Sequence, residues 1–261
     1  MLNQDDFRDI WLNKLTEQQR KVRAEKAFAV IKKVAEKQLA LFAKFEKFGR
    51  PDGLRFSYFY QTIESVWENV DFILSLGKGK NKRFAFYPAR AIMENAFRLE
   101  FFSRQKKEFQ EDIAIKECLR ICKRNYEHEL SDGNVGEAER FKNYYCDFTK
   151  LGNFTLIENI SERALDPFPS LWELMKNSKI NGGTDWYYHY QGLAESTHGK
   201  YMHLSMISKT PNEHYRLSLM YALIMCNDLL KNADYQLVGK TREDVIQAIK
   251  ISESIIKRPV Q

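Results

Sequence analysis

Three of the five histidines in this chain, His189, His198 and His203, lie within residues 187–208 among aromatic and hydroxyl side chains. Imidazole groups so close in sequence suggest metal binding or proton transfer. On a helix that turns about 100° per residue, His189 and His198 point to opposite sides, and His203 lies about 140° from His198. A single helix cannot aim all three at one ion. The sequence therefore predicts no metal site, and it indicates no cofactor.

A polar pair lies on a helix that is predicted to begin near Pro88. Arg90 and Glu94 are one helical turn apart in "RAIMENAFRLEFF", where apolar side chains surround nearly the whole helix. Such a helix is expected at the centre of the fold, so both charges should be enclosed and should need partners. The two residues form either a structural ion pair or the floor of a polar site.

We expect Arg90 and Glu94 to face His198 and Tyr190 of a later helix across a shared polar pocket, because buried charges need polar company. In a ribonuclease, His198 would move the proton of a ribose 2′-hydroxyl while Arg90 binds the phosphate. In the alternative, His198 and Glu94 form a hydrogen bond that only fixes helix packing. Ser196 is a weaker nucleophile candidate, because on a helix it points about 200° away from His198.

Aromatic side chains gather in the same part of the sequence, at Trp172, Trp186, Tyr187 and Tyr190. Several tyrosines with one arginine and one histidine would suit a small anionic ligand, although aromatic residues at this density also build ordinary cores. The alternative to an enzyme is therefore a helical module that binds such a ligand or a protein partner, for example one encoded by a neighbouring gene.

The stretches "RAIMENAFRLEFF" and "LWELMKNSKINGGTDWYYHYQGLAESTHGKYMH" resemble a bacterial family of uncharacterised helical proteins. Its members pair an Arg-x-x-x-Glu helix with a Trp-led helix and a later Tyr…Ser…His helix. The family is similar to HEPN-type helical domains, many of which are ribonucleases or parts of toxin–antitoxin and phage-defence systems. The resemblance implies a protein that acts on or near RNA in stress or defence. It assigns the recurring positions to Arg90, Glu94, Trp172, Tyr190, Ser196 and His198.

The chain departs from the HEPN hallmark, in which an arginine is followed by a histidine after four to six residues on one helix. In "KRNYEH", only three residues separate Arg124 from His128, although Lys123 has the right distance. An exposed, charge-rich helix end accounts for Arg124, Glu127 and His128 without any catalytic role.

Few residues interrupt helix formation in this sequence. The 261 residues include only 12 Gly and 6 Pro, while hydrophobic residues make up 44%. This composition predicts an all-α, single-domain helical bundle of about seven to nine helices. A basic N-terminal helical segment, residues 1–50, should precede a helical bundle domain, residues 51–261. We expect the long N-terminal helices to project and to form a homodimer.

Basic charge is concentrated near the N-terminus. Residues 14–50 hold eleven Lys or Arg against four Glu, while the whole chain carries a formal charge of +6. Such a surface either attracts phosphate backbones, as in RNA, or is only a solvated helix face. No apolar run approaches about 18 residues and the N-terminus is acidic, so we expect a cytoplasmic protein without membrane contact. The four cysteines are expected to be free thiols.

Overall fold

The structure, a computed structural model, consists of helices. It describes residues 16–45, 51–77, 81–151, 156–180, 185–198 and 211–257. Within these residues the chain is 87% helical, has no strand, and forms eight helices of at least seven residues. The prediction of an all-α fold with a long N-terminal helix is confirmed. None of the described helices is long and apolar enough to cross a membrane.

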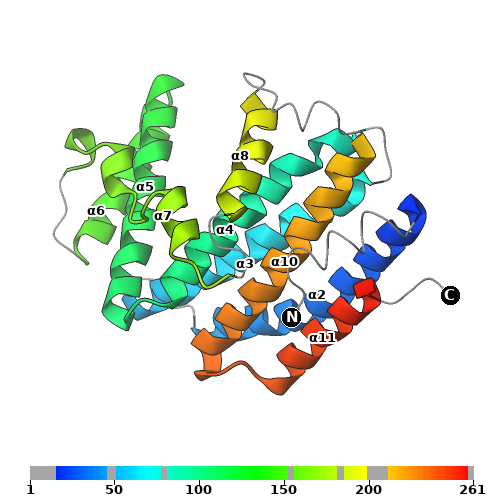
Figure 1. Cartoon of the computed structure of the whole chain (residues 1–261). Coiled ribbons are helices and arrows are strands. Elements are labelled where there is room, and N and C mark those ends of the chain that lie inside the picture. The colour runs from blue at the N-terminus through cyan, green and yellow to red at the C-terminus, as the bar shows by residue number, and fades with distance from the viewer. Residues whose placement is uncertain are drawn as a thin grey trace. The chain divides into compact units, whose positions relative to one another are not determined.

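Local sequence signals explain where several helices begin. Proline occupies the first position of α3 and α10, where its missing N–H has no partner to lose. At α7, the Ser170 hydroxyl accepts the N–H of Glu173, and the Glu173 carboxylate accepts the N–H of Ser170, which is a capping box. Figure 1 labels the helices, which are α2 (Glu17–Phe45), α3 (Pro51–Leu76), α4 (Phe86–Ser103), α5 (Lys107–Ser131), α6 (Val135–Thr149), α7 (Leu171–Lys176), α8 (Asp185–His198), α10 (Pro211–Val238) and α11 (Glu243–Lys257), with 3-10 turns η1 (Lys82–Ala85), η2 (Ile157–Asn159) and η3 (Glu162–Leu165).

The helices are grouped into two compact units. The first unit consists of Met1–Phe42, Phe59–Ser103 and Ser170–Gln261, and the second consists of Ala43–Tyr58 and Arg104–Pro169. Helix α3 therefore contributes residues to both units. The domain boundary expected at residue 50 stays a prediction.

Helix α4 lies at the centre of the first unit. It contacts η1, α7, α8 and α10, and Figure 1 shows α10 running beside it. Ile92, Phe97 and Phe102 of α4 have no exposed surface. Burial of each such side chain contributes roughly 1.5–3 kcal/mol. The predicted central, mostly apolar helix is thus confirmed, and it forms the base on which α7 and α8 are placed.

Helix α2 packs along the first unit instead of projecting from it. The Phe42 ring stacks on Phe59 of α3 with centroids 5.2 Å apart, and Phe28 meets Trp67 edge-on at 6.5 Å. The buried Gln38 amide donates a hydrogen bond of 2.9 Å to the Leu230 carbonyl of α10. The expected projection is wrong for α2, because its apolar stripe is long enough to be covered by neighbouring helices along its length.

Helices α10 and α11 are joined by a short, well-defined connection. Gly239 has φ 74° and its N–H donates to the Tyr235 carbonyl at 2.8 Å, so it ends α10 in the left-handed conformation that favours glycine. The Asp234 carboxylate, fully buried, accepts the Arg242 backbone N–H at 2.5 Å and its Nε at 2.7 Å. This contact fixes the direction in which α11 starts.

The second unit has its own core between α5 and α6. Leu119 and Tyr145 are fully buried there, together with Leu54, Ala114, Ile115, Cys122, Ile157 and Leu165. All four cysteines of the chain are free, as expected. Burial raises the pKa of Cys118 to about 12, with smaller contributions from Cys122 and Glu117, and it raises the pKa of Cys122 to about 11. Burial also raises the pKa of Cys226 in the first unit.

We expect Cys118, Cys122 and Cys226 to resist alkylation in the folded protein. The thiolate is the reactive form, and at pH 7.5 a thiol of pKa about 11 is ionised in fewer than roughly one molecule in a thousand. Iodoacetamide treatment followed by peptide mass spectrometry should leave these three unmodified, whereas all four cysteines should react in urea. Equal labelling rates of Cys122 in the native and the unfolded protein would contradict the protection.

Candidate binding site on helices α4, α7 and α8

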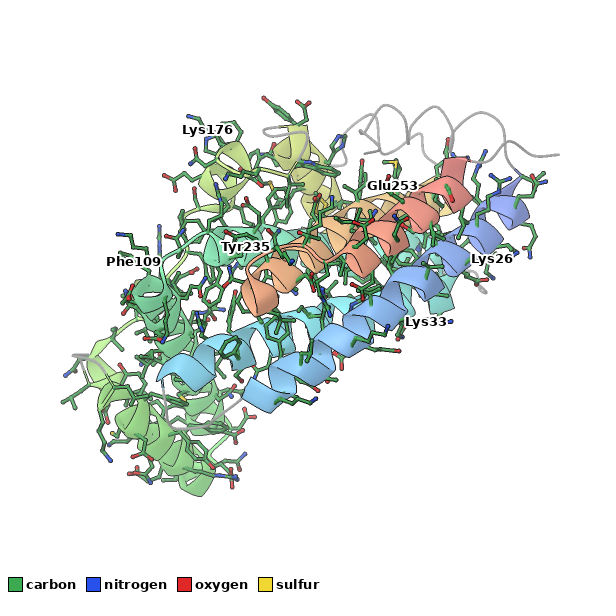
Figure 2. All side chains as sticks on the ribbon, turned by 90° about the horizontal axis from the view of Figure 1, so that it is seen from below. Lys26, Lys33, Phe109, Lys176, Tyr235 and Glu253 are labelled. Carbon is green, nitrogen blue, oxygen red and sulfur yellow. The ribbon has the colours of Figure 1, made fainter. Side chains whose placement is uncertain are left out.

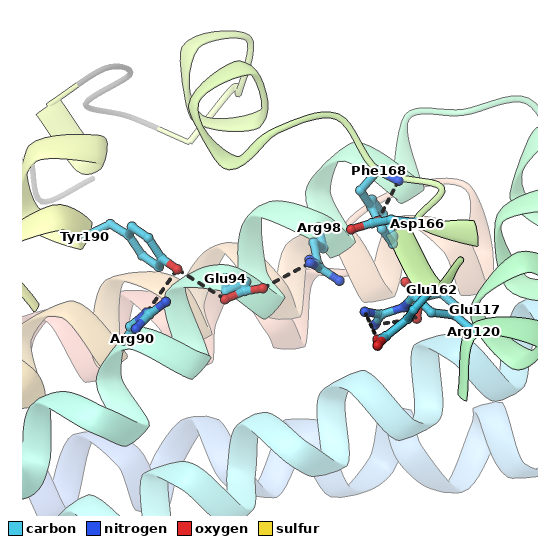
Figure 3. Close-up of polar contacts among 9 residues, drawn as sticks. All are labelled: Arg90, Glu94, Arg98, Glu117, Arg120, Glu162, Asp166, Phe168 and Tyr190. Atoms are coloured by element: carbon cyan, nitrogen blue, oxygen red, sulfur yellow. Dashed lines mark hydrogen bonds and ion pairs between the residues drawn. The ribbon is translucent and has the colours of Figure 1, made fainter. Parts of the chain in front are cut away.

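A row of charged side chains lies on one side of α4. Arg90, Glu94 and Arg98 follow at intervals of four residues and so share a helix face. The Arg90 Nε donates to the Tyr190 hydroxyl of α8 at 2.9 Å, and that hydroxyl donates to Glu94 Oε2 at 3.4 Å. Arg98 Nη2 lies 3.0 Å from Glu94 Oε1. Figure 3 shows this continuous chain of contacts. The predicted contacts of Tyr190 with Arg90 and Glu94 are confirmed, while the predicted contact of His198 with the same pair falls outside the described side chains.

The network lies at the edge of the core. Tyr190 is 7% exposed, but the Glu94 and Arg98 side chains keep 30% and 18% of their surface exposed. The expected enclosure of Arg90 and Glu94 is therefore wrong, because long charged side chains reach along the helix toward water while their stems stay covered. The charged ends remain accessible to a ligand.

The environment of Tyr190 favours its neutral phenol. Burial raises the pKa of Tyr190, and the Glu94 charge raises it further, while Arg90 opposes both effects. The Arg90 guanidinium also lies over the Tyr190 ring, with Cζ 4.9 Å from the centroid, a cation–π contact. A neutral hydroxyl can accept from Arg90 and donate to Glu94 at the same time. Tyr190 thus links the two charges and attaches α8 to α4.

The predicted aromatic set is divided between two environments. Trp172 of α7 and Tyr187 of α8 meet edge-on with ring centroids 4.9 Å apart, and Trp172 is 37% exposed. Trp186 has no exposed surface and packs on Tyr221 of α10 at 5.7 Å. Trp186 is consequently a core residue and not part of a pocket, because it lies on the buried side of α8. Trp172 and Tyr187 remain as aromatic residues at the surface.

Two neighbouring polar contacts had no clear sequence signal. The His189 Nδ1 lies 2.9 Å from the Tyr221 hydroxyl, which explains this histidine as a partner of α10. The buried Glu100 of α4 accepts the Lys179 N–H at 3.1 Å, just beyond α7. By contrast, Arg98 could have been found, since it is four residues after Glu94. Together these contacts hold α7 and α8 in place around the network.

Ser196, His198 and His203 are the remaining residues that the sequence suggested for chemistry. Ser196 and His198 belong to helix α8, but their side chains lie outside the described part of the structure, as does His203. The eight residues from Tyr190 to His198 correspond to about 12 Å along the helix axis. The roles of Ser196 and His198 stay predictions. Among the side chains that are described, no group of three or more His, Cys, Asp or Glu could hold a metal ion.

The charged end of α5 contains the shortened HEPN-like pattern. Arg124, Glu127 and His128 are exposed. Glu127 pairs with Lys123 at 3.0 Å, and His128 Nδ1 lies 3.3 Å from Asp132. The interpretation of this segment as a solvated, charge-rich helix end is confirmed.

Comparisons with known proteins add no relative. No family model, no curated protein and no solved structure matches this chain.

Proposed function

We propose that the first unit binds a small anion carrying a planar ring, at the surface formed by α4, α7 and α8. The observation that carries the proposal is the half-buried Arg90 guanidinium, held at its Nε by the Tyr190 hydroxyl at 2.9 Å. A guanidinium fixed in this way loses little further freedom when it binds a carboxylate or phosphate. Arg98 supplies a second positive charge on the same helix face.

The ring of the ligand would pack near Trp172 and Tyr187. Tyr187 precedes Tyr190 by three residues, so the two side chains are neighbours on α8. Trp172 and Tyr187 already meet edge-on and both remain partly exposed. Because these two aromatic side chains are partly exposed, they offer a flat apolar surface to the ring of a ligand beside the arginines. A charged end and a ring face thus lie next to each other on adjoining helices.

The geometry supports binding better than catalysis. Burial and the Glu94 charge raise the pKa of Tyr190, which disfavours the phenolate that a general base needs, and the Glu94 carboxylate already pairs with Arg98. The helix rise separates the backbones of Tyr190 and His198 by about 12 Å. Arg90, Arg98 and Tyr190 of this network are therefore suited to recognition of a ligand.

Isothermal titration with adenosine 5′-monophosphate and with inorganic phosphate would test the proposal. We expect saturable binding of the nucleotide that is tighter than that of phosphate, because only the nucleotide has a ring. Arg90→Met should weaken nucleotide binding about 10–100-fold, the value of a charged hydrogen bond. Glu94→Gln should retain or strengthen binding, since it removes a negative charge beside the ligand.

Arg83→Met is the matched control, because Arg83 is exposed and lies on η1, outside the network. Its nucleotide affinity should equal that of the unmodified protein. If the protein binds no nucleotide and Arg90→Met strongly lowers the melting temperature, the contacts among Arg90, Glu94, Arg98 and Tyr190 have only a structural role.

An RNA-directed function of the HEPN-like kind, in stress or phage defence, is the second candidate. The basic character of α2 favours it, with eight Lys or Arg against three Glu within Glu17–Phe45. Cleavage of a labelled RNA that is lost in His198→Ala, at an unchanged melting temperature, would select this candidate over ligand binding alone.

A further inference from the structure

Adjacent lysines on α2 have different environments. Lys32 Nζ lies 2.7 Å from the Asp71 carboxylate of α3, so its charge is paired within the protein. Lys26, Lys33 and Lys37 are exposed, and none has an ion pair within the described residues. Figure 2 shows Lys26 and Lys33 on the outer side of α2. We call Lys26, Lys33 and Lys37 the lysine row.

Helix geometry aligns the lysine row. Spacings of seven and four residues place the three side chains within a sector of about 40° and along about 17 Å of the helix axis. Glu25 and Glu36 lie roughly 80–100° from Lys26 around the helix, outside this sector. The row is therefore a straight line of positive charge without an intervening carboxylate.

The residues between the lysines decide what kind of polyanion fits. Ala29 and Ala40 are exposed beside the sector, about 60° and 40° from Lys26 around the helix, and both are small enough for a close approach by a backbone. Helices that bind a membrane surface instead place large apolar side chains such as Trp, Phe or Leu beside their lysines. On the other flank of the lysine row Val30 and Leu41 are half-buried, so the row presents its charge in a narrow line, which suits a chain of phosphates.

We propose that the lysine row binds the phosphate backbone of a double-stranded nucleic acid. A duplex carries one negative charge per about 1.7 Å of its axis, so 17 Å of α2 faces enough phosphates to engage all three ammonium groups. Such contacts release counterions and read no sequence. The choice of a nucleic acid as the partner rests on the second candidate function. The binding itself requires neither cleavage of RNA nor a ligand bound at α4.

Fluorescence anisotropy with labelled 20-base-pair duplexes of RNA and of DNA, between 50 and 200 mM salt, would test the proposal. Three phosphate contacts predict that log K falls with log salt at a slope of about −2.7. The double variant Lys33→Gln with Lys37→Gln should reduce the slope by about 1.8 and the affinity at 0.1 M salt by about 60-fold. Its melting temperature should be unchanged, because both side chains are exposed.

The matched control is Lys106→Gln with Lys240→Gln, which removes the same charge from two exposed lysines outside α2. The control should keep the slope and affinity of the unmodified protein. An equal loss in the control would show that net charge alone drives binding and would overturn the proposal, as would the absence of duplex binding at 50 mM salt.

Two further results separate this inference from the alternatives. DNA has no 2′-hydroxyl, so retained DNA binding without RNA cleavage would refute the ribonuclease candidate while leaving the lysine row supported. Tighter binding to vesicles containing phosphatidylserine than to either duplex would overturn the choice of nucleic acid as the partner.

Discussion

Arg242→Ala should lower the free energy of unfolding of the first unit by about 3 kcal/mol. The substitution leaves Asp234, whose side chain has no exposed surface, without the guanidinium 2.7 Å away. A buried carboxylate that loses its partner cannot regain water, so the cost exceeds that of an exposed ion pair. The Arg242 backbone N–H still donates to Asp234, which keeps the loss from being larger.

Urea denaturation followed by tryptophan fluorescence would measure this change. Trp67, Trp172 and Trp186 belong to the first unit, and the sequence of the second unit contains no tryptophan, so the signal reports the first unit. Asp244→Ala is the control, because Asp244 is an exposed partner 3.9 Å from Arg242 and should cost less than about 0.5 kcal/mol. A loss below 1 kcal/mol for Arg242→Ala would show that the contact does not hold α11.

Trp186→Ala should destabilise the first unit by about 3–5 kcal/mol, the range for removing a fully buried large aromatic residue. The Trp186 ring has no exposed surface and meets His189 and Tyr221 at 5.9 and 5.7 Å. The resulting cavity would loosen α8 from α10. Because Tyr190 lies one turn after Trp186, its hydrogen bonds to Arg90 and Glu94 should weaken as well.

Tyr188→Ala provides a comparison on the same helix, since Tyr188 is 65% exposed and should cost less than about 0.5 kcal/mol. Trp186→Phe should recover part of the loss, because a smaller ring fills part of the cavity. Unfolding in urea, monitored by the remaining tryptophans, distinguishes these cases. Similar midpoints for Trp186→Ala and Tyr188→Ala would contradict a core role for Trp186.

The helices themselves were predictable because their signals are local. Phe28, Ile31, Ala35 and Phe42 recur every three, four or seven residues, which is the spacing of one helix face, and all four are buried on α2. Ser170 and Glu173 have the spacing of a capping box, and α7 begins there. Local hydrogen bonds and apolar periodicity depend on neighbours within one or two turns, which are readable along the chain.

The candidate site was only partly predictable. The cost of burying charges indicated that Arg90 and Glu94 need partners, and Tyr190 supplies them. The separation of Trp186 from Trp172 depended on how α8 is rotated against α4 and α10, whereas the i,i+4 pair of Glu94 and Arg98 lies within α4 and was readable from spacing. Sequence spacing gives the angle between residues on one helix, but not the direction in which that helix faces its neighbours.

The sequence by itself determined the all-α class, the position of most helices, and the presence of polar residues that require partners. Only the tertiary structure decided which of these residues meet. Two lysines that are adjacent in sequence illustrate the difference, since Lys32 pairs with Asp71 of α3 while Lys33 faces solvent. Helix periodicity separates them by about 100°, but the packing of α2 against α3 determines which of the two is paired and which is left for a partner.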